Sequence, residues 1–163
     1  MSVVDASVAP TATPLTAAQA LEYLSTLDLT MIRLKLADPE EGQGWSIEQL
    51  DLAEREYRRF LALHLLHPDR AIVPCKLVDL VWHAHILDTM AYGPDCERLF
   101  GFFLHHFPYF GMRGEQDAAD LRSTYDQTVE LYRAAFGEPP AGVWRPEDKM
   151  KCNRTNCHPQ KCR

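Results

Sequence analysis

Seven side chains that can bind metal ions or take part in acid–base or redox chemistry lie in one short, otherwise apolar stretch, VDLVWHAHILDTMAYGPDC, residues 78–96. They are Asp79, His83, His85, Asp88, Tyr92, Asp95 and Cys96. Imidazole and thiolate groups suit copper, zinc or iron, whereas imidazole combined with carboxylate suits iron or zinc. The composition therefore indicates either a metal or catalytic centre or a buried helix whose polar groups are hydrogen-bonded.

Helical geometry divides these candidates into two groups, because each residue of a helix turns about 100°. Asp79 and His83 are four residues apart and share a face, where the carboxylate can orient the imidazole or both can bind one ion. His85, Asp88 and Tyr92 share a nearly opposite face. On a regular helix His83 and His85 point about 160° apart and cannot bind the same ion. The next segment can complete either group, since it carries Asp95, Cys96, His105 and His106.

We expect this cluster to bind copper or iron. The metal ligands are expected to come from four histidines: His83, His85, His105 and His106. Asp79 is expected to orient His83, and Tyr92 or Cys96 to tune the metal or take part in redox chemistry. Zinc-activated water is an alternative chemistry for imidazole–carboxylate sites. A further alternative is that the histidines form hydrogen bonds within a core and bind no metal.

A second group of candidate ligands lies near the C-terminus, in KCNRTNCHPQKCR, where Cys152, Cys157 and Cys162 are spaced C-x4-C-x4-C. Three thiolates and the neighbouring His158 suffice for a tetrahedral zinc site, and thiolates also suit Cu(I). This spacing is not that of a standard zinc ribbon or knuckle, so a tail with reactive thiols is the alternative. We expect zinc or copper here, at a centre separate from the histidine cluster.

Composition excludes several classes of protein. The chain of 163 residues has a net charge of −6, which argues against a nucleic-acid partner. It has no apolar run of the ~20 residues that cross a bilayer, and its first residues do not resemble a secretory signal. We therefore expect a cytoplasmic protein without a membrane partner, whose five cysteines do not form a disulfide framework. The oligomeric state cannot be inferred from these features.

The elements that must position the candidates are helices. Apolar residues recur at helical spacing, no segment alternates like a strand, and Thr16–Gln19 and Ser46–Gln49 match capping boxes. We predict an all-α, single-domain bundle of about five helices at residues 16–137, after a disordered lead at 1–15. Residues 138–163 are predicted to form a Pro/Gly loop, anchored by Trp144, and an irregular Cys-containing tail. The central, largely buried helix is predicted to run from Lys76 to about Tyr92 and to end at Gly93-Pro94.

The motif Trp-His-x-His-x-Leu, followed by Tyr and Asp-Cys, resembles the GRDP-like family of glycine-rich domain-containing proteins. The residues that carry the resemblance are Trp82, His83, His85, Leu87, Tyr92, Asp95 and Cys96. The similarity extends over about residues 34–137 and is to the small bacterial type, since the chain has eight glycines and no glycine-rich region. It implies that the motif is important without naming a reaction.

The chain also lacks a nucleotide-binding glycine loop, a nucleophile elbow and a dinucleotide-binding fingerprint. Together with the histidine cluster, this favours a metal-dependent oxidase or oxygenase that acts on a small molecule or peptide in a specialised biosynthetic pathway. The alternative is a non-catalytic helical module that binds a metal or a protein partner.

Overall fold

A computed structural model describes residues 14–149 of the chain, and within that range it is all-helical, without a β-strand. The α-helices are α1 (Ala17–Leu24), α2 (Thr30–Ala37), α3 (Ile47–Leu66), α4 (Lys76–Leu87), α5 (Thr89–Phe100) and α6 (Glu115–Phe136), followed by a short 3-10 helix, Pro146–Lys149. The all-α prediction is confirmed. The expected number of about five helices was too low by one. None of the helices in residues 14–149 is long and apolar enough to cross a membrane.

Both predicted capping boxes begin helices. The Thr16 hydroxyl accepts a hydrogen bond from the Gln19 amide, and the Gln19 side chain accepts one from the Thr16 backbone N–H. Ser46 and Gln49 make the same reciprocal pair at the start of α3. Each pair satisfies backbone donors that have no partner inside the helix. These two helix starts therefore depend on local sequence alone.

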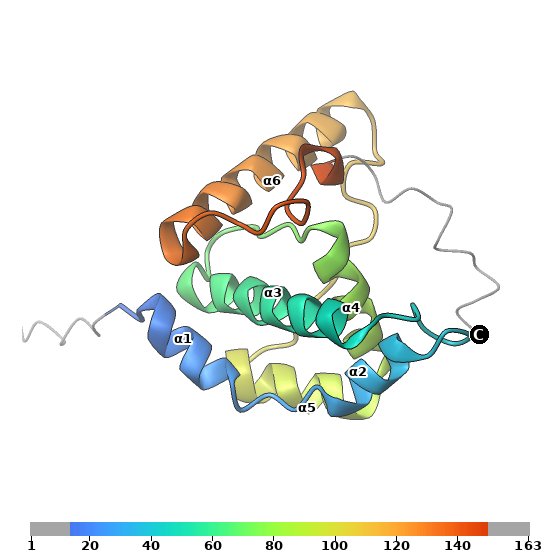
Figure 1. Cartoon of the computed structure of the whole chain (residues 1–163). Helices are drawn as coiled ribbons and strands as arrows, with labels where there is room; N and C mark the ends of the chain where they lie inside the picture. The colour runs from blue at the N-terminus through green and yellow to red at the C-terminus, as the bar shows by residue number, and fades with distance from the viewer. Residues whose placement is uncertain (1–13, 150–163) are drawn as a thin grey trace, which may run out of the picture.

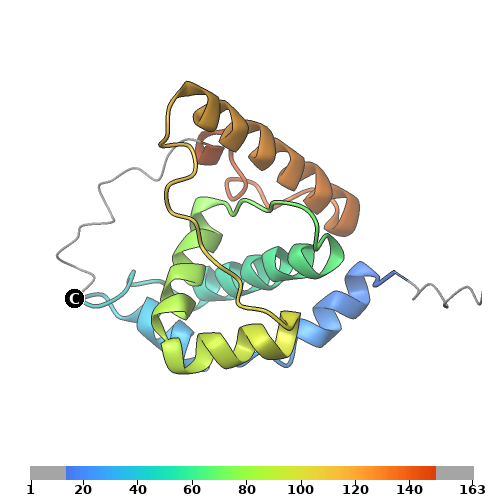
Figure 2. The same ribbon diagram turned by 180° about the vertical axis from the view of Figure 1, so that it is seen from behind.

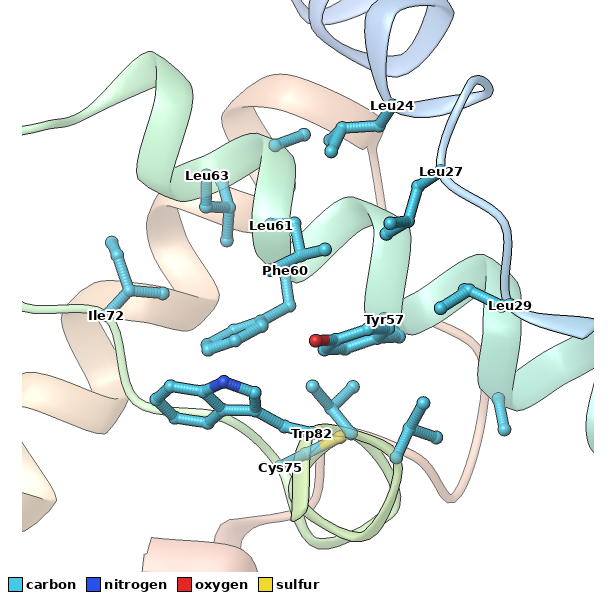
Figure 3. Packing of buried hydrophobic residues seen from close by; sticks show 14 of the residues in the cluster. Leu24, Leu27, Leu29, Tyr57, Phe60, Leu61, Leu63, Ile72, Cys75 and Trp82 are labelled. Atoms are coloured by element: carbon cyan, nitrogen blue, oxygen red, sulfur yellow. The ribbon is translucent and has the colours of Figure 1, made fainter. Parts of the chain in front are cut away.

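Helix α3 lies at the centre of the bundle and packs against α1, α2, α4 and α6 (Figure 1). Its apolar side points Tyr57 and Phe60 toward Trp82 of α4 (Figure 3). Leu24 and Leu27, from α1 and the connection after it, cover the same layer from the other side. Burial of these large side chains holds the helices together, at about 25 cal/mol for each Å² of apolar surface removed from water.

The helix break near the histidine cluster differs from the prediction. Helix α4 ends at Leu87, and Gly93-Pro94 lies inside α5. The reason is Asp88, whose carboxylate accepts a hydrogen bond from the Ala91 amide and begins a new helix before Gly93 is reached. Helix α4 buries Val78, Val81, Trp82 and His85, but Leu87 at its end is 70% exposed.

The connection between α5 and α6, residues 101–114, is the segment that completes the candidate site. Gly101 ends α5 in the left-handed conformation, with φ of 73°. The chain then runs as an extended strap across the α3–α4 side of the bundle before α6 begins (Figure 2). Leu104 is buried on this strap, while its neighbour His105 is exposed. The strap therefore presents alternate side chains to the bundle and to solvent.

The loop after α6 is anchored by Trp144, as predicted. Trp144 is buried, and its Nε1 donates a 3.0 Å hydrogen bond to Oε2 of Glu56 on α3. Glu56 is fully buried and also accepts a 2.8 Å hydrogen bond from the hydroxyl of Tyr132 on α6. Arg59 lies 3.2 Å from its other oxygen. The carboxylate thus joins α3, α6 and the loop.

Candidate metal centre

Asp79, His83 and His106 bring three potential metal ligands together. One ligand atom from each residue lies within 4.8 Å of the other two, and no other such group occurs in residues 14–149. The Nε2 atom of His106 is 3.0 Å from both Nε2 of His83 and Oδ1 of Asp79. The second carboxylate oxygen of Asp79 is 3.7 Å from Nδ1 of His83.

Two of these distances match the geometry of a bound ion. With metal–ligand bonds of about 2.1 Å and angles of 90–110° at the metal, two ligand atoms lie about 3.0–3.4 Å apart. The 3.0 Å separations around His106 Nε2 are at the short end of this range. The same separations fit hydrogen bonds among neutral imidazoles and a carboxylate. Metal binding therefore requires a small outward movement of the three side chains and imidazole tautomers whose Nε2 atoms carry no proton.

Local helix geometry and the strap together position the triad. Asp79 and His83 face the same side of α4 because they are four residues apart. His106 comes from the extended strap, where successive side chains alternate in direction, so that His106 points inward and His105 points to solvent. Among the described residues, His105 contacts the ring of Phe103 and is not part of the triad.

Trp82 and Tyr92 support His106. The indole of Trp82 packs against the His106 ring, with centroids 4.7 Å apart, and its Nε1 donates a 2.8 Å hydrogen bond to the Tyr92 hydroxyl. Tyr92 in turn donates a 2.5 Å hydrogen bond to the carbonyl of Leu104, two residues before His106. Tyr92 therefore fixes both the ring beside His106 and the backbone that carries it. Contacts of this kind around a ligand side chain hold it in the orientation that metal binding needs.

The electrostatic environment of His83 favours its neutral form. Burial lowers the pKa of His83, although the nearby Asp79 carboxylate acts in the opposite direction. A neutral imidazole is the form that binds a metal ion, so His83 needs no costly deprotonation near neutral pH. The side chains of the triad are between 18% and 33% exposed, so one side of the triad is open to solvent.

His85 lies apart from the triad, on the opposite side of α4. Its Nδ1 is 2.8 Å from the hydroxyl of Tyr57, and its Nε2 is 3.1 Å from Oδ2 of Asp95. Burial lowers the pKa of His85. Because both ring nitrogens are engaged, His85 is a hydrogen-bonded core histidine in this conformation. Asp95 was among the residues expected to complete a cluster, but nothing in the spacing pointed to Tyr57.

The remaining predicted residues have different positions. Cys96 is buried on α5 next to Tyr92, and burial, with the Cys96 thiol nearby, raises the pKa of Tyr92. Cys152, Cys157 and Cys162 lie outside the described residues, so their binding of zinc or copper stays a prediction. Truncation after Met150, followed by metal counting, tests whether they form a separate centre.

Comparison with known proteins places the chain in a family. The sequence profile described as UCP032817-like matches residues 26–131, which include α2 to α5, the strap and most of α6. The chain belongs to the UCP032817-like family. Neither a curated protein nor a solved structure gives a significant match.

This match corrects the resemblance drawn from the sequence. Membership of the GRDP-like family is wrong, because the profile that matches residues 26–131 is that of a different family. The physical reason for the error is that the resemblance depended on a few motif residues around Trp82 and Cys96. A pattern of that kind follows from one buried helix pair and does not distinguish families. The matched region contains all three residues of the triad.

Sequence reasoning missed the burial of Glu56 and of one ring nitrogen of His64. In the sequence, Glu56 resembles any other charged residue of an amphipathic helix. Its burial results from the packing of Tyr132 and Trp144 around it. On α3, the Nε2 atom of His64 is buried without a hydrogen-bond partner among the described residues. Burial lowers the pKa of His64 to about 4, so the ring is neutral.

Proposed function

We propose that Asp79, His83 and His106 bind one iron ion and that the protein is a metal-dependent oxidase or oxygenase. The observation that carries this proposal is the approach of two imidazoles and one carboxylate to within 4.8 Å. Two histidines and one carboxylate, with other coordination positions open, form the ligand set typical of non-haem Fe(II) oxygenases. The carboxylate favours iron over copper, whereas the histidines alone fit either metal.

The open side of the triad supports a substrate that approaches from solvent. His83 is the most exposed of the three, with 33% of its side chain accessible. The strap that carries His106 also exposes Phe103 and Phe107, which offer apolar contact surface beside the ligand. A small molecule or a peptide with apolar groups fits such a surface, and a role in a specialised biosynthetic pathway is part of the proposal.

The residues of the chain have distinct roles in this proposal. His83 and His106 hold the ion, and Asp79 both binds it and balances its charge. Trp82 positions His106 by packing against its ring, and Tyr92 positions it through hydrogen bonds to Trp82 and to the strap. When bound, iron would supply the redox chemistry, while the protein limits which side of the ion a substrate reaches.

The experiment is iron reconstitution of the full chain under anaerobic conditions, followed by metal counting and titration with nitric oxide, a dioxygen analogue that binds open Fe(II) positions. One iron per chain and a nitric oxide complex are expected. His106→Gln should lose both while keeping its helical circular dichroism spectrum. His105→Gln is the matched control, because its side chain is adjacent in sequence and exposed, and it should behave like the unmodified chain.

Three outcomes would contradict the proposal. Iron content that is unchanged in His106→Gln would place the ion elsewhere. Retention of zinc in preference to iron would favour hydrolytic chemistry through activated water. Failure to retain any metal, with His106→Gln unfolding more readily than His105→Gln, would make the triad a hydrogen-bond network that ties the strap to α4. The non-catalytic module would then be the better description.

A further inference from the structure

The strap that carries His106 joins α5 to α6, which lie on opposite sides of α3 (Figures 1 and 2). Residues 103–107 of the strap belong to no helix, strand or turn. The backbone around His106 is therefore held by contacts with the rest of the bundle and not by a regular element of its own. The position of the imidazole then depends on how the strap is anchored on each side of it.

Each side of the strap has an anchor. On the α5 side, the Tyr92 hydroxyl donates a hydrogen bond to the Leu104 carbonyl. On the α6 side, the anchor is Asp117. Its Oδ2 accepts hydrogen bonds from the backbone N–H groups of Gly111 at 2.7 Å and of Arg113 at 3.1 Å, and its Oδ1 accepts one from the Arg113 guanidinium at 2.8 Å. One carboxylate on α6 thus binds three donors at the end of the strap.

Gly111 brings the backbone of the strap directly against α6. It is buried and has a φ of 83°, in the left-handed region that favours glycine. A Cβ atom at this position would lie 2.5 Å from Cδ2 of Leu121, which is closer than two carbon atoms can approach. The strap therefore contacts α6 without an intervening side chain, and the hydrogen bond to Asp117 holds it there.

Arg113 extends this anchor back toward His106. Its guanidinium carbon lies 4.9 Å from the centroid of the Phe107 ring, where a cation is attracted to the face of the ring. The hydrogen bond with Arg113 also lowers the pKa of Asp117, so the carboxylate is charged at neutral pH and holds the guanidinium in place. Phe107 directly follows His106 in the chain. Contacts therefore connect Asp117 on α6 with the residue next to the proposed metal ligand.

We propose that Asp117 is a positioning residue of the metal centre and that, through Gly111 and Arg113, it holds the strap so that His106 stays in the triad. This inference rests on the proposed function, because it concerns the same metal ligands. Tyr92 fixes the strap on one side of His106, and Asp117 fixes it on the other. Metal affinity then depends on α6, a helix that contributes no ligand to the triad.

The first measurement uses the metal-free, isotope-labelled full chain and detects the position of His106. The ring protons of His106 and Trp82 should show a nuclear Overhauser effect, because the ring centroids are 4.7 Å apart. Asp117→Ala should weaken this effect. Asp117→Asn should largely restore it, since the amide oxygen still accepts hydrogen bonds from the backbone of the strap. Asp120→Ala is the matched control and should cause no change, because the Asp120 carboxylate accepts its hydrogen bond from Gln116 of the same helix.

The second measurement is the Fe(II) affinity of the same variants under anaerobic conditions. Asp117→Ala should raise the dissociation constant about 10-fold, at the lower end of the range for losing contacts that support a metal ligand. Asp120→Ala should leave it unchanged. Arg113→Gln loses the contact with Phe107 but keeps the backbone hydrogen bonds of Asp117, so its effect should lie between the two. Each variant is compared where its circular dichroism spectrum shows it folded, so that a loss of global stability does not enter the dissociation constant.

The two measurements separate this inference from the proposed function. An unchanged nuclear Overhauser effect in Asp117→Ala would overturn the inference, whether or not the chain binds iron. Unchanged Fe(II) affinity in that variant, when the original chain binds iron, would overturn it as well. Absence of iron from the original chain would contradict the proposed function, and the nuclear Overhauser effect would still decide whether Asp117 holds His106. If Asp117→Ala does not fold, an unchanged effect in Arg113→Gln would overturn the inference.

Discussion

The Nε2 atoms of His83 and His106 lie 3.0 Å apart, although 23 positions separate the two residues in the chain. This approach joins the rigid helix α4 to the strap that follows α5. Without a metal, the contact is a hydrogen bond that depends on one ring donating a proton. With a metal, both nitrogens turn their lone pairs to the ion. The metal-free and metal-bound states differ in the protonation of the two rings and in the strength of the contact between them. Metal binding should therefore change the stability of the folded chain.

Metal binding should stabilise the folded chain. At an Fe(II) concentration 100 times the dissociation constant, the free energy of unfolding should rise by about 2.7 kcal/mol, because the ion binds the folded state and not the unfolded one. Urea unfolding under anaerobic conditions, with and without Fe(II), measures this change. His83→Gln should show no increase. An equal increase in that variant would mean that the ion stabilises the chain from another place.

Tyr92→Phe should weaken both the fold and the metal centre. The change leaves the Trp82 indole N–H and the Leu104 carbonyl without their partner, which costs about 1–3 kcal/mol for a buried unsatisfied group. Urea unfolding measures the loss. Iron affinity should fall as well, since His106 loses its support. Tyr109→Phe is the control, because Tyr109 is 58% exposed and should change stability by less than about 0.5 kcal/mol.

Acid should destabilise the protein partly through His64. Burial lowers the pKa of this histidine from 6.5 to about 4 in the folded chain, so the unfolded chain binds more protons between those two values. Stability from this group is therefore complete above about pH 6.5 and is lost as the pH falls toward 4, by up to about 3 kcal/mol.

His64→Met provides the comparison, because methionine fills an apolar site and does not titrate. The difference in unfolding free energy between the original chain and His64→Met should change between pH 7 and pH 4. A difference that stays constant over this range would show that His64 accepts a proton in the folded state at its ordinary pKa.

Removing the Glu56 carboxylate should be among the most destabilising single changes. Glu56→Ala leaves the buried hydroxyl of Tyr132 and the indole N–H of Trp144 without their acceptor, and breaking a buried charged network costs about 3–5 kcal/mol. Denaturant unfolding followed by circular dichroism measures the loss. Glu40→Ala, at an exposed loop position, should stay within about 0.5 kcal/mol of the original. A similar effect in both variants would contradict the assigned role of Glu56.

Asp88 should act as the N-cap that separates α4 from α5. Asp88→Ala removes the acceptor for the Ala91 amide and should cost about 1 kcal/mol, whereas Asp88→Asn retains a capping side chain and should cost much less. Thermal or urea unfolding of the two variants measures the difference. Equal costs would indicate that the break at residue 88 is imposed by packing and not by the cap.

Several features depend on short-range sequence and could be predicted from it. The capping boxes at Thr16 and Ser46 involve residues three positions apart, and Asp79 and His83 share a face because the helix repeats every 3.6 residues. The all-α fold follows from the same periodicity. Trp144 was recognisable as an anchor because it is a large apolar side chain in a polar loop, which gains free energy by being buried.

Other features were decided by the tertiary structure. His85, His105 and His106 are chemically identical, and only the path of the strap brings His106 to Asp79 while it leaves His105 in solvent. The partners of His85, which are Tyr57 and Asp95, come from two other helices. Such contacts depend on how helices distant in sequence pack around one core, and a local pattern carries no information about that packing. The sequence alone therefore determined the all-helical class, the starts of α1 and α3 and the first two members of the triad, whereas packing selected the third.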